Sequence, residues 1–342
     1  MQVRQLRKEH PDSHYVSALL QYVKNFSVRF RDNLMLVSVD DKAIIPVEEP
    51  NCHVSTGVRG HNRSLVPHSG AQVVALDHDF HIHGIVPSVS FFIDIPETAS
   101  DSFYRGDPFV TNKDKVSQPS SALRHCTELT NIIRTHHSDQ DHLSKPILVV
   151  VSDGGPDHRV TFGSVKVASL TLFRALDLDM LICIRTCPYQ SWTNVAERVM
   201  STLNLALQNV SLARTAMADH FERLVKNKNS LADVREAIKM NTDLGPALLD
   251  SMSAPLVTVS QRFQAMKIKD NEVKVGVPAS ESEIDTQFQH AHFIEPSLDK
   301  DNLTAKDLAK ANSLQRFMKI HCHSSSYVFQ VKKVYESRMF LL

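Results

Sequence analysis

The chain contains one uninterrupted apolar segment that ends in an acidic turn, Pro146–Arg159, with the sequence PILVVVSDGGPDHR. Its apolar residues, Ile147 to Val151, have no polar residue among them, as in a strand that is buried on both faces. Asp153 follows this run, and the Gly-Gly-Pro after it predicts a turn. Asp153 is therefore expected at the carboxyl end of a central strand, where open α/β sheets bind their ligands. The alternative is that Asp153 only caps the turn.

Further acidic residues stand at other predicted element ends. A second apolar strand, at about 34–40, runs into Asp40 and Asp41. Because neighbouring strand residues point to opposite faces, only one of the two can enter a shared site. We favour Asp40, which directly ends the apolar run, and keep Asp41 as its rival. Glu197 is expected in the first turn of a helix over 194–214, where Asn194 and Glu197 also fit a capping box, a purely structural alternative.

These motifs resemble the catalytic core of DDE transposases and retroviral-type integrases. The segment SDGGPDHR is similar to the second-Asp motif of that group, a strand followed by S/T-D-N-G-x-E/D, with Gly154 in place of the usual Asn. NVAERVMSTLN is similar to the third motif, N-x-x-E-R at the start of a helix. The 43 residues between Asp153 and Glu197 form a longer gap than in the retroviral enzymes, within the range of transposases. The resemblance covers residues 34–214.

The resemblance implies a ribonuclease H-like α/β fold, in which a five-stranded mixed sheet with an initial antiparallel meander is flanked by helices. Hydrophobic periodicity predicts the same element order independently of the acidic residues. The expected strands are 34–40, 72–76, 85–95, 147–152 and 180–185, and the expected helices are 12–31, 120–136, 162–175 and 194–214. Both lines of reasoning therefore predict one α/β core over 34–214.

The regions outside this core are predicted separately. Residues 1–33 are expected to form a packing helix that buries Tyr15, Leu19, Tyr22 and Phe26 as one stripe. Residues 215–342 are expected to be mainly helical, with a polar linker near 270–300 and a short strand at 327–331.

By the same resemblance, Asp40, Asp153 and Glu197 would hold two Mg²⁺ or Mn²⁺ ions, with Asp40 bridging the pair. Such hard cations prefer oxygen ligands, and two of them can clamp the attacking and leaving oxygens of a phosphodiester.

Three neighbouring side chains are candidates for nucleic-acid contact, with a structural role as the alternative for each. His158 and Arg159 would touch the scissile phosphate, and Trp192 would stack on a base.

The expected function is therefore metal-dependent DNA cleavage and strand transfer, with DNA as the partner and homo-oligomerisation left open. One alternative is a domesticated, catalytically silent binding or scaffold protein derived from a transposase. Another is a ribonuclease H-type hydrolase that acts on RNA–DNA hybrids. Basic and acidic residues both number 38, so the formal net charge is zero. Nucleic-acid enzymes usually carry a positive excess, so this balance favours the scaffold alternative.

Composition also bears on the compartment. The five cysteines form no C-x-x-C pair, the first residues contain no apolar signal segment, and no apolar run approaches the ~18 residues of a membrane span. We expect an intracellular, nuclear protein with no membrane partner.

Overall fold

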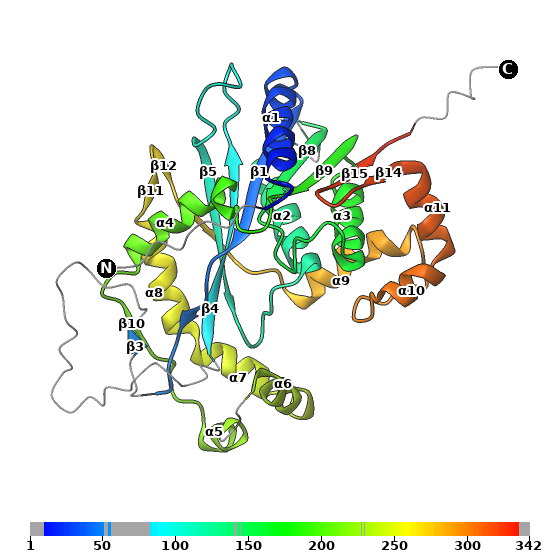
Figure 1. Ribbon diagram of the computed structural model, residues 1–342. Helices are drawn as coiled ribbons and strands as arrows, with labels where there is room; N and C mark the ends of the chain where they lie inside the picture. The colour runs from blue at the N-terminus through cyan, green and yellow to red at the C-terminus, as the bar shows by residue number, and fades with distance from the viewer. Residues whose placement is uncertain are drawn as a thin grey trace.

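The protein is described by a computed structural model that covers residues 10–50, 54–55, 83–139, 142–143, 145–226, 228 and 230–334. Its centre is a mixed sheet with the strand order β13-β5-β4-β1-β8-β9-β15-β14, and β2 pairs with β4 beside it (Figure 1). The strands of this sheet are β1 (Leu34–Asp41), β2 (Ile45–Pro46), β4 (Gly84–Ile93), β5 (Gly106–Asp114), β8 (Ile147–Ser152), β9 (Met180–Arg185), β13 (Lys274–Gly276), β14 (Cys322–Ser324) and β15 (Val328–Lys332).

Helices cover both faces of the sheet and one of its ends. They are α1 (Ser13–Arg29), α2 (Ala122–His136), α3 (Gly163–Ala175), the 3₁₀ turn η1 (Ser191–Thr193), α4 (Ala196–Ala206), α5 (Asp219–Val225), α6 (Leu231–Met240), α7 (Leu244–Ser251), α8 (Ser253–Gln264), α9 (Glu281–His292), α10 (Ala305–Lys310) and α11 (Asn312–His321). Short two-stranded pairs join β3 (Val54–Ser55) with β10 (Ser211–Leu212), β6 (Ser138–Asp139) with β7 (His142–Leu143), and β11 (Lys267–Ile268) with β12 (Asn271–Glu272). None of the helices in the described part of the chain has the length and apolarity needed to span a bilayer.

The carboxyl ends of β1, β8 and β9 lie at the same end of the sheet, because these three strands are parallel. β4 is antiparallel to both β1 and β5, whereas β8 is parallel to β1 and β9 is parallel to β8. In this register Val39 pairs with Ser152, and Ser152 pairs with Arg185. The chain therefore leaves β1 and β8 side by side, and the predicted α/β class with a mixed, helix-flanked sheet is confirmed. The described sheet has nine strands rather than the predicted five, because β2, β13, β14 and β15 extend it.

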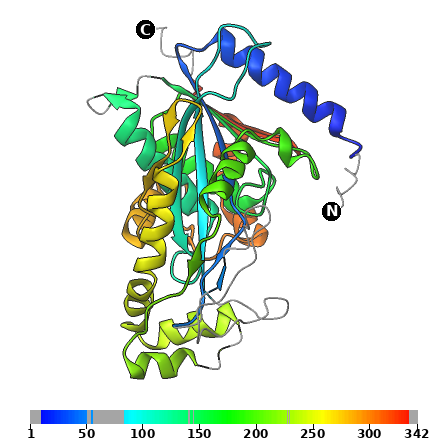
Figure 2. The ribbon, with the colours of Figure 1, turned by 90° about the vertical axis from the view of Figure 1, so that its left-hand side faces the viewer.

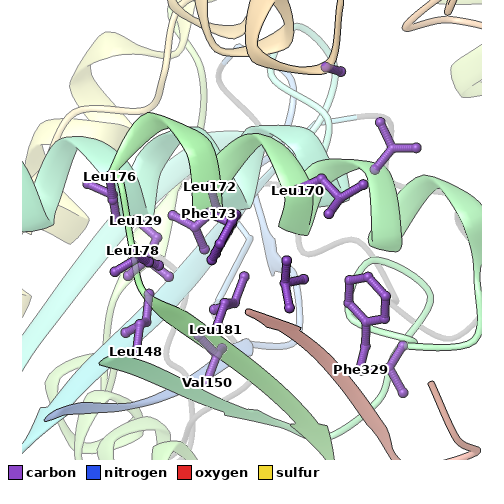
Figure 3. Close-up of a cluster of buried hydrophobic side chains, with 14 of the residues drawn as sticks. Leu129, Leu148, Val150, Leu170, Leu172, Phe173, Leu176, Leu178, Leu181 and Phe329 are labelled. Atoms are coloured by element: carbon purple, nitrogen blue, oxygen red, sulfur yellow. The ribbon is translucent and has the colours of Figure 1, made fainter. Parts of the chain in front are cut away.

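Alternation along β1 divides the core between two faces. Met35, Val37 and Val39 face α2, α3 and α9, where α3 packs its leucines over Leu148 and Val150 of β8 (Figure 3). Leu34 and Leu36 belong to the opposite cluster, with residues of α4 and α8. α1 and the α5–α7 group lie at opposite ends of the molecule (Figures 1 and 2).

One core strand differs from the prediction. The expected strand at 72–76 lies outside the described residues, and the partner of β4 is β5, in the polar segment GDPFVTNKD. Hydrophobic periodicity did not detect β5, because the strand buries polar side chains whose partners lie elsewhere in the fold. Lys113 Nζ lies 3.4 Å from Asp41 Oδ1, and Asn112 Nδ2 donates to Ser260 Oγ at 2.9 Å.

The predicted buried stripe of α1 is wrong for its tyrosines. Tyr15 and Tyr22 are 53% and 70% exposed. The other two predicted residues, Leu19 and Phe26, are partly buried against the core, as is Val23, and the most buried residues of the helix are Val16 and Ser27. Val16, Val23 and Ser27 have helical spacing as well, and these smaller residues let the helix approach the sheet more closely than tyrosines would.

The C-terminal region differs from the prediction at the expected linker. Helices α5 to α8 lie in the part that was expected to be helical, and β15 lies at the predicted strand. Near 270–300, however, the chain forms β13 and α9, and α9 buries Phe288 against the α2–α3 face. α4 ends at Ala206 rather than 214, because Asn209 turns the chain with φ of 59° into β10.

Candidate functional site

Asp40 is the buried acid at the carboxyl end of β1, with 6% of its surface exposed. Asn194 Nδ2 donates to Asp40 Oδ2 at 3.3 Å and to the Val39 carbonyl at 3.0 Å. Ser38 Oγ donates to Asn194 Oδ1 and accepts from the Ala196 N–H at 3.0 Å. Polar contacts from β1 therefore hold the start of α4, and the carboxylate of Asp40 is held by the same contacts.

Asp153 follows β8 and caps the next turn, as the structural alternative for this residue predicted. Its Oδ1 accepts from the Gly155 N–H at 2.8 Å, while its other oxygen has no hydrogen-bond partner among the described residues. Gly154 has φ of +81°, and a Cβ at that position would lie 2.9 Å from Arg185 Cδ. Glycine therefore permits this tight turn, and Asp153 caps it with one oxygen while the second remains available to a ligand.

Electrostatics relate Asp40 to Asp153 and Glu197. Burial, followed by the negative charges of Asp153 and Glu197, raises the pKa of Asp40 to about 8. Glu197 is in the first turn of α4, and it also raises the pKa of Lys42, which burial lowers overall. The structure thus brings the three acids into one neighbourhood, where like charges oppose the ionisation of the most buried one. An all-oxygen set of three carboxylates fits Mg²⁺ or Mn²⁺.

The capping-box alternative for Glu197 is wrong. α4 begins at Ala196 with Val195 as its N-cap, and no side chain caps it from that position. The amide of Asn194, which is buried, contacts β1 instead. Sequence reasoning missed Ser38 and this role of Asn194. Asn194 could have been found from its place at the start of NVAER, whereas a serine within an apolar strand carries no such signal.

Asp41 points to the opposite face of β1, as strand alternation requires. Its carboxylate lies within hydrogen-bonding reach of three side chains: Ser120 Oγ at 2.7 Å, His125 Nε2 at 3.3 Å and Lys113 Nζ at 3.4 Å. Burial would raise the pKa of Asp41, but the charges of His125 and Lys113 hold it well below its usual range. Asp41 therefore belongs to a separate charged cluster and does not compete with Asp40.

His158 lies in the Asp41 cluster, not beside Asp40, which differs from the expected phosphate contact. Its ring centroid is 4.5 Å from that of His125, and burial lowers its pKa to about 3. A group that can hold a metal ion is formed by Asp41, His125 and His158, whose ligand atoms lie within 4.8 Å of one another.

The other two candidates for nucleic-acid contact are at the surface. Arg159 is exposed, with its guanidinium 5.0 Å from the Phe162 ring. Trp192 is 53% exposed in η1 and lines a cavity of about 250 Å³ that Ser38 and Val151 also line. This cavity is on the Asp40 side of the sheet, so Trp192 keeps a position compatible with a base contact.

Comparison with protein-family models, with curated proteins and with solved structures gave no match to this chain.

Proposed function

We propose that this chain is a metal-dependent enzyme that cleaves phosphodiesters in DNA and transfers the strands. In this proposal Asp40, Asp153 and Glu197 hold a pair of Mg²⁺ or Mn²⁺ ions. The observation that carries it is the electrostatic effect of two carboxylates on a third: the pKa of the buried Asp40 is raised to about 8 by burial and by the charges of Asp153 and Glu197. A site with that much uncompensated negative charge is suited to divalent cations.

The topology supports the same proposal. The order β5-β4-β1-β8-β9, with an antiparallel meander followed by two parallel strands, is the order expected for a ribonuclease H-like core. In such a core the catalytic acids stand at the ends of the first and fourth strands and on the helix after the fifth. Asp40, Asp153 and Glu197 occupy those three positions.

The chain's own residues have distinct roles in this proposal. The metal pair, when bound, supplies charge neutralisation at the scissile phosphate. Asn194 orients the Asp40 carboxylate, and Ser38 holds the Asn194 amide in place. Asp153 presents its uncapped oxygen from a turn that Gly154 makes possible. Each ligand is thus on an element end whose position is fixed by buried contacts, as a preorganised site requires.

The test is a plasmid-nicking assay with Mn²⁺. Asp153→Asn keeps the turn, since an Asn oxygen can also accept from Gly155, but removes one charge. We expect Asp153→Asn and Glu197→Gln each to lower the cleavage rate roughly 100-fold or more, because loss of a direct ligand exceeds the 10–100-fold cost of outer-shell changes. Asp179→Asn, at an acid just before β9 and so at the opposite end of the sheet, serves as the matched control and should cleave at the wild-type rate. Equal rates in all four proteins would refute the assignment.

A scaffold function is the second candidate, and the zero formal net charge favours it. It predicts that wild type cleaves neither DNA nor an RNA–DNA hybrid with either metal, and that Mn²⁺ leaves its melting temperature unchanged. The same assay with a hybrid substrate tests the hydrolase alternative, which predicts faster cleavage of the hybrid than of DNA.

A further inference from the structure

The cluster on the far face of β1 is built from three separate elements. Asp41 ends β1, His125 is in the first half of α2, and His158 lies in the loop between β8 and α3. Their ligand atoms lie within 4.8 Å of one another, and the cluster borders an internal cavity lined by Ser88, His125 and His158. Nothing in the proposed phosphodiester chemistry uses these side chains.

The hydrogen bonds of the cluster leave several acceptors directed at one point. Ser88 Oγ lies 3.1 Å from His125 Nδ1, and in the tautomer in which Nδ1 donates to Ser88 the His125 Nε2 atom carries a lone pair. That nitrogen is 3.3 Å from Asp41 Oδ2, which is also an acceptor. His158 Nε2 is buried and has no hydrogen-bond partner among the described residues. With His125 in that tautomer, a metal ion between these acceptors would satisfy them together with the unpaired His158 nitrogen.

The donor set and its spacing are suited to Zn²⁺. Two imidazoles and one carboxylate are a common zinc set, which leaves a fourth position for water. Tetrahedral ligands at about 2.0–2.1 Å from Zn²⁺ are about 3.3–3.4 Å from each other, which matches the distance between His125 Nε2 and Asp41 Oδ2. We propose that Asp41, His125 and His158 form a Zn²⁺ site, separate from the carboxylate site on the opposite face.

Lys113 is the cation that stands nearest to this position in the described structure. Its Nζ lies 3.4 Å from Asp41 Oδ1 and 3.5 Å from His125 Nε2, long contacts for hydrogen bonds. It also lies 4.0 Å from Glu128 Oε2, a buried oxygen without a hydrogen-bond partner in the described part of the chain. Zinc binding would displace Lys113 toward Glu128 and so give that oxygen its missing donor.

The site would connect the two faces of the sheet. Zn²⁺ would link the end of β1 to α2 and to the loop that carries Asp153 five residues before His158. Bound Zn²⁺ is thus expected to fix the backbone near both Asp40 and Asp153 from the opposite face of the sheet.

Metal content and Co²⁺ absorption test this proposal on the full chain. Purified protein is stripped with a chelator, dialysed and titrated with Zn²⁺, and separately with Co²⁺. We expect one Zn²⁺ per chain and the visible absorption of tetrahedral Co²⁺. His158→Gln should weaken Zn²⁺ binding roughly 100-fold or more, given that even outer-shell changes cost 10–100-fold. His125→Gln is the second variant and should do the same.

Two controls identify the site. His136→Gln replaces an exposed histidine of the same helix and should bind Zn²⁺ as wild type does. Asp153→Asn should also keep its zinc, which separates this site from the carboxylate site whether or not the chain cleaves DNA. Circular dichroism with chelator present checks that each variant is folded. Absence of stoichiometric Zn²⁺ from folded wild type, or unchanged affinity in both folded histidine variants, would overturn the proposal.

Discussion

Asp40 and Asp41 are neighbours in sequence, yet the fold gives them opposite properties. β1 sends Asp40 toward α4 and two other acids, and burial and those charges raise its pKa to about 8. Asp41 points toward His125 and Lys113, which hold its pKa well below the usual range. One residue of strand register therefore separates a carboxylate beside two other acids from one beside a lysine and a histidine.

The raised pKa of Asp40 predicts a pH dependence of stability without divalent metal. A group with a raised folded-state pKa contributes its full stability below its unfolded value of 3.8, and that contribution is lost as pH rises toward about 8. We expect the free energy of unfolding in chelator to fall between pH 5 and 8, chiefly above pH 6.5, by an amount on the order of 2 kcal/mol. Below pH 6.5 the lowered pKa of His158 acts in the opposite direction. Asp40→Asn should flatten this slope in urea denaturation.

Two comparisons make that experiment specific. Asp41, whose pKa is lowered, loses its contribution only as pH falls below its ordinary value of 3.8, so it does not act in the window from pH 5 to 8. Asp157→Asn should keep the wild-type slope. A slope that persists in Asp40→Asn would show that another group causes it.

The acids of the site were predictable from sequence, but their supports were not. Asp153 and Glu197 belong to motifs with a recognisable local pattern, and Asp40 was favoured over Asp41 because it directly ends the apolar run. Asn194 fitted a capping box equally well, and only its contacts with β1 show that it orients Asp40. His125 and His158 are 33 positions apart in sequence, and their proximity depends on how α2 packs on the sheet.

At the scale of elements, β1 and α4 are joined through one serine. The N–H of Ala196 would lack a side-chain acceptor at the start of α4, because Val195 cannot cap it. Ser38 supplies that acceptor from the neighbouring strand at 3.0 Å. The position of Glu197 on α4 thus depends on a hydroxyl that is far from it in sequence.

Ser38→Ala should therefore lower the free energy of unfolding by about 1–2 kcal/mol, the usual cost of losing a cap and a buried hydrogen bond. Thermal denaturation measures the change. Ser201→Ala, which removes an exposed hydroxyl of α4, should change stability by less than about 0.5 kcal/mol. If the two variants are equally stable, Ser38 does not hold the helix.

Strand β5 shows why part of the fold escaped sequence reasoning. Periodicity detects apolar faces, and β5 buries Lys113 and Asp114 among polar partners instead. The α1 stripe was wrong for its tyrosines for a related reason, because two stripes of equal spacing exist on one helix and only the sheet selects between them. Apolar strands such as β8 and β9 were predictable because their burial requires no specific partner.

At the scale of the whole molecule, a buried arginine connects the α5–α8 region to the sheet. Arg214 donates to both oxygens of Glu222, each at 2.7 Å, and also pairs with Glu49. Its own side chain is fully buried, whereas the two glutamates are partly exposed. Glu49 follows β2, Arg214 follows β10 and Glu222 lies in α5. These ion pairs therefore hold the end of the sheet against α5.

Arg214→Met should destabilise the protein by about 3 kcal/mol, near the lower end for a broken buried pair because water can reach the glutamates. Urea denaturation measures the loss. Adding Glu222→Gln should restore part of it, since one uncompensated charge is removed. Lys267→Met breaks an exposed pair with Glu272 and should cost less than about 1 kcal/mol. An equal loss in both single variants would contradict this assignment.

Phe329 tests whether the C-terminal region unfolds with the core. It is fully buried on β15, in the same cluster as the leucines of α3 (Figure 3). Phe329→Ala should cost about 3–5 kcal/mol. The loss should appear in the transition reported by Trp192, the chain's single tryptophan. Phe293→Ala, at an exposed position, should have little effect. A separate transition that leaves Trp192 fluorescence unchanged would indicate an independent C-terminal domain.

Because β15 lies late in the sequence, the central sheet can be completed only near the end of synthesis. β15 pairs antiparallel with β9, although 142 residues separate Arg185 from Val328. Until the ribosome has released that later segment, β9 presents a row of unpaired backbone groups on an apolar strand. A nascent chain of this protein therefore has an unpaired, aggregation-prone edge strand through much of its translation. We expect its yield in the cell to depend on chaperones that cover such strands.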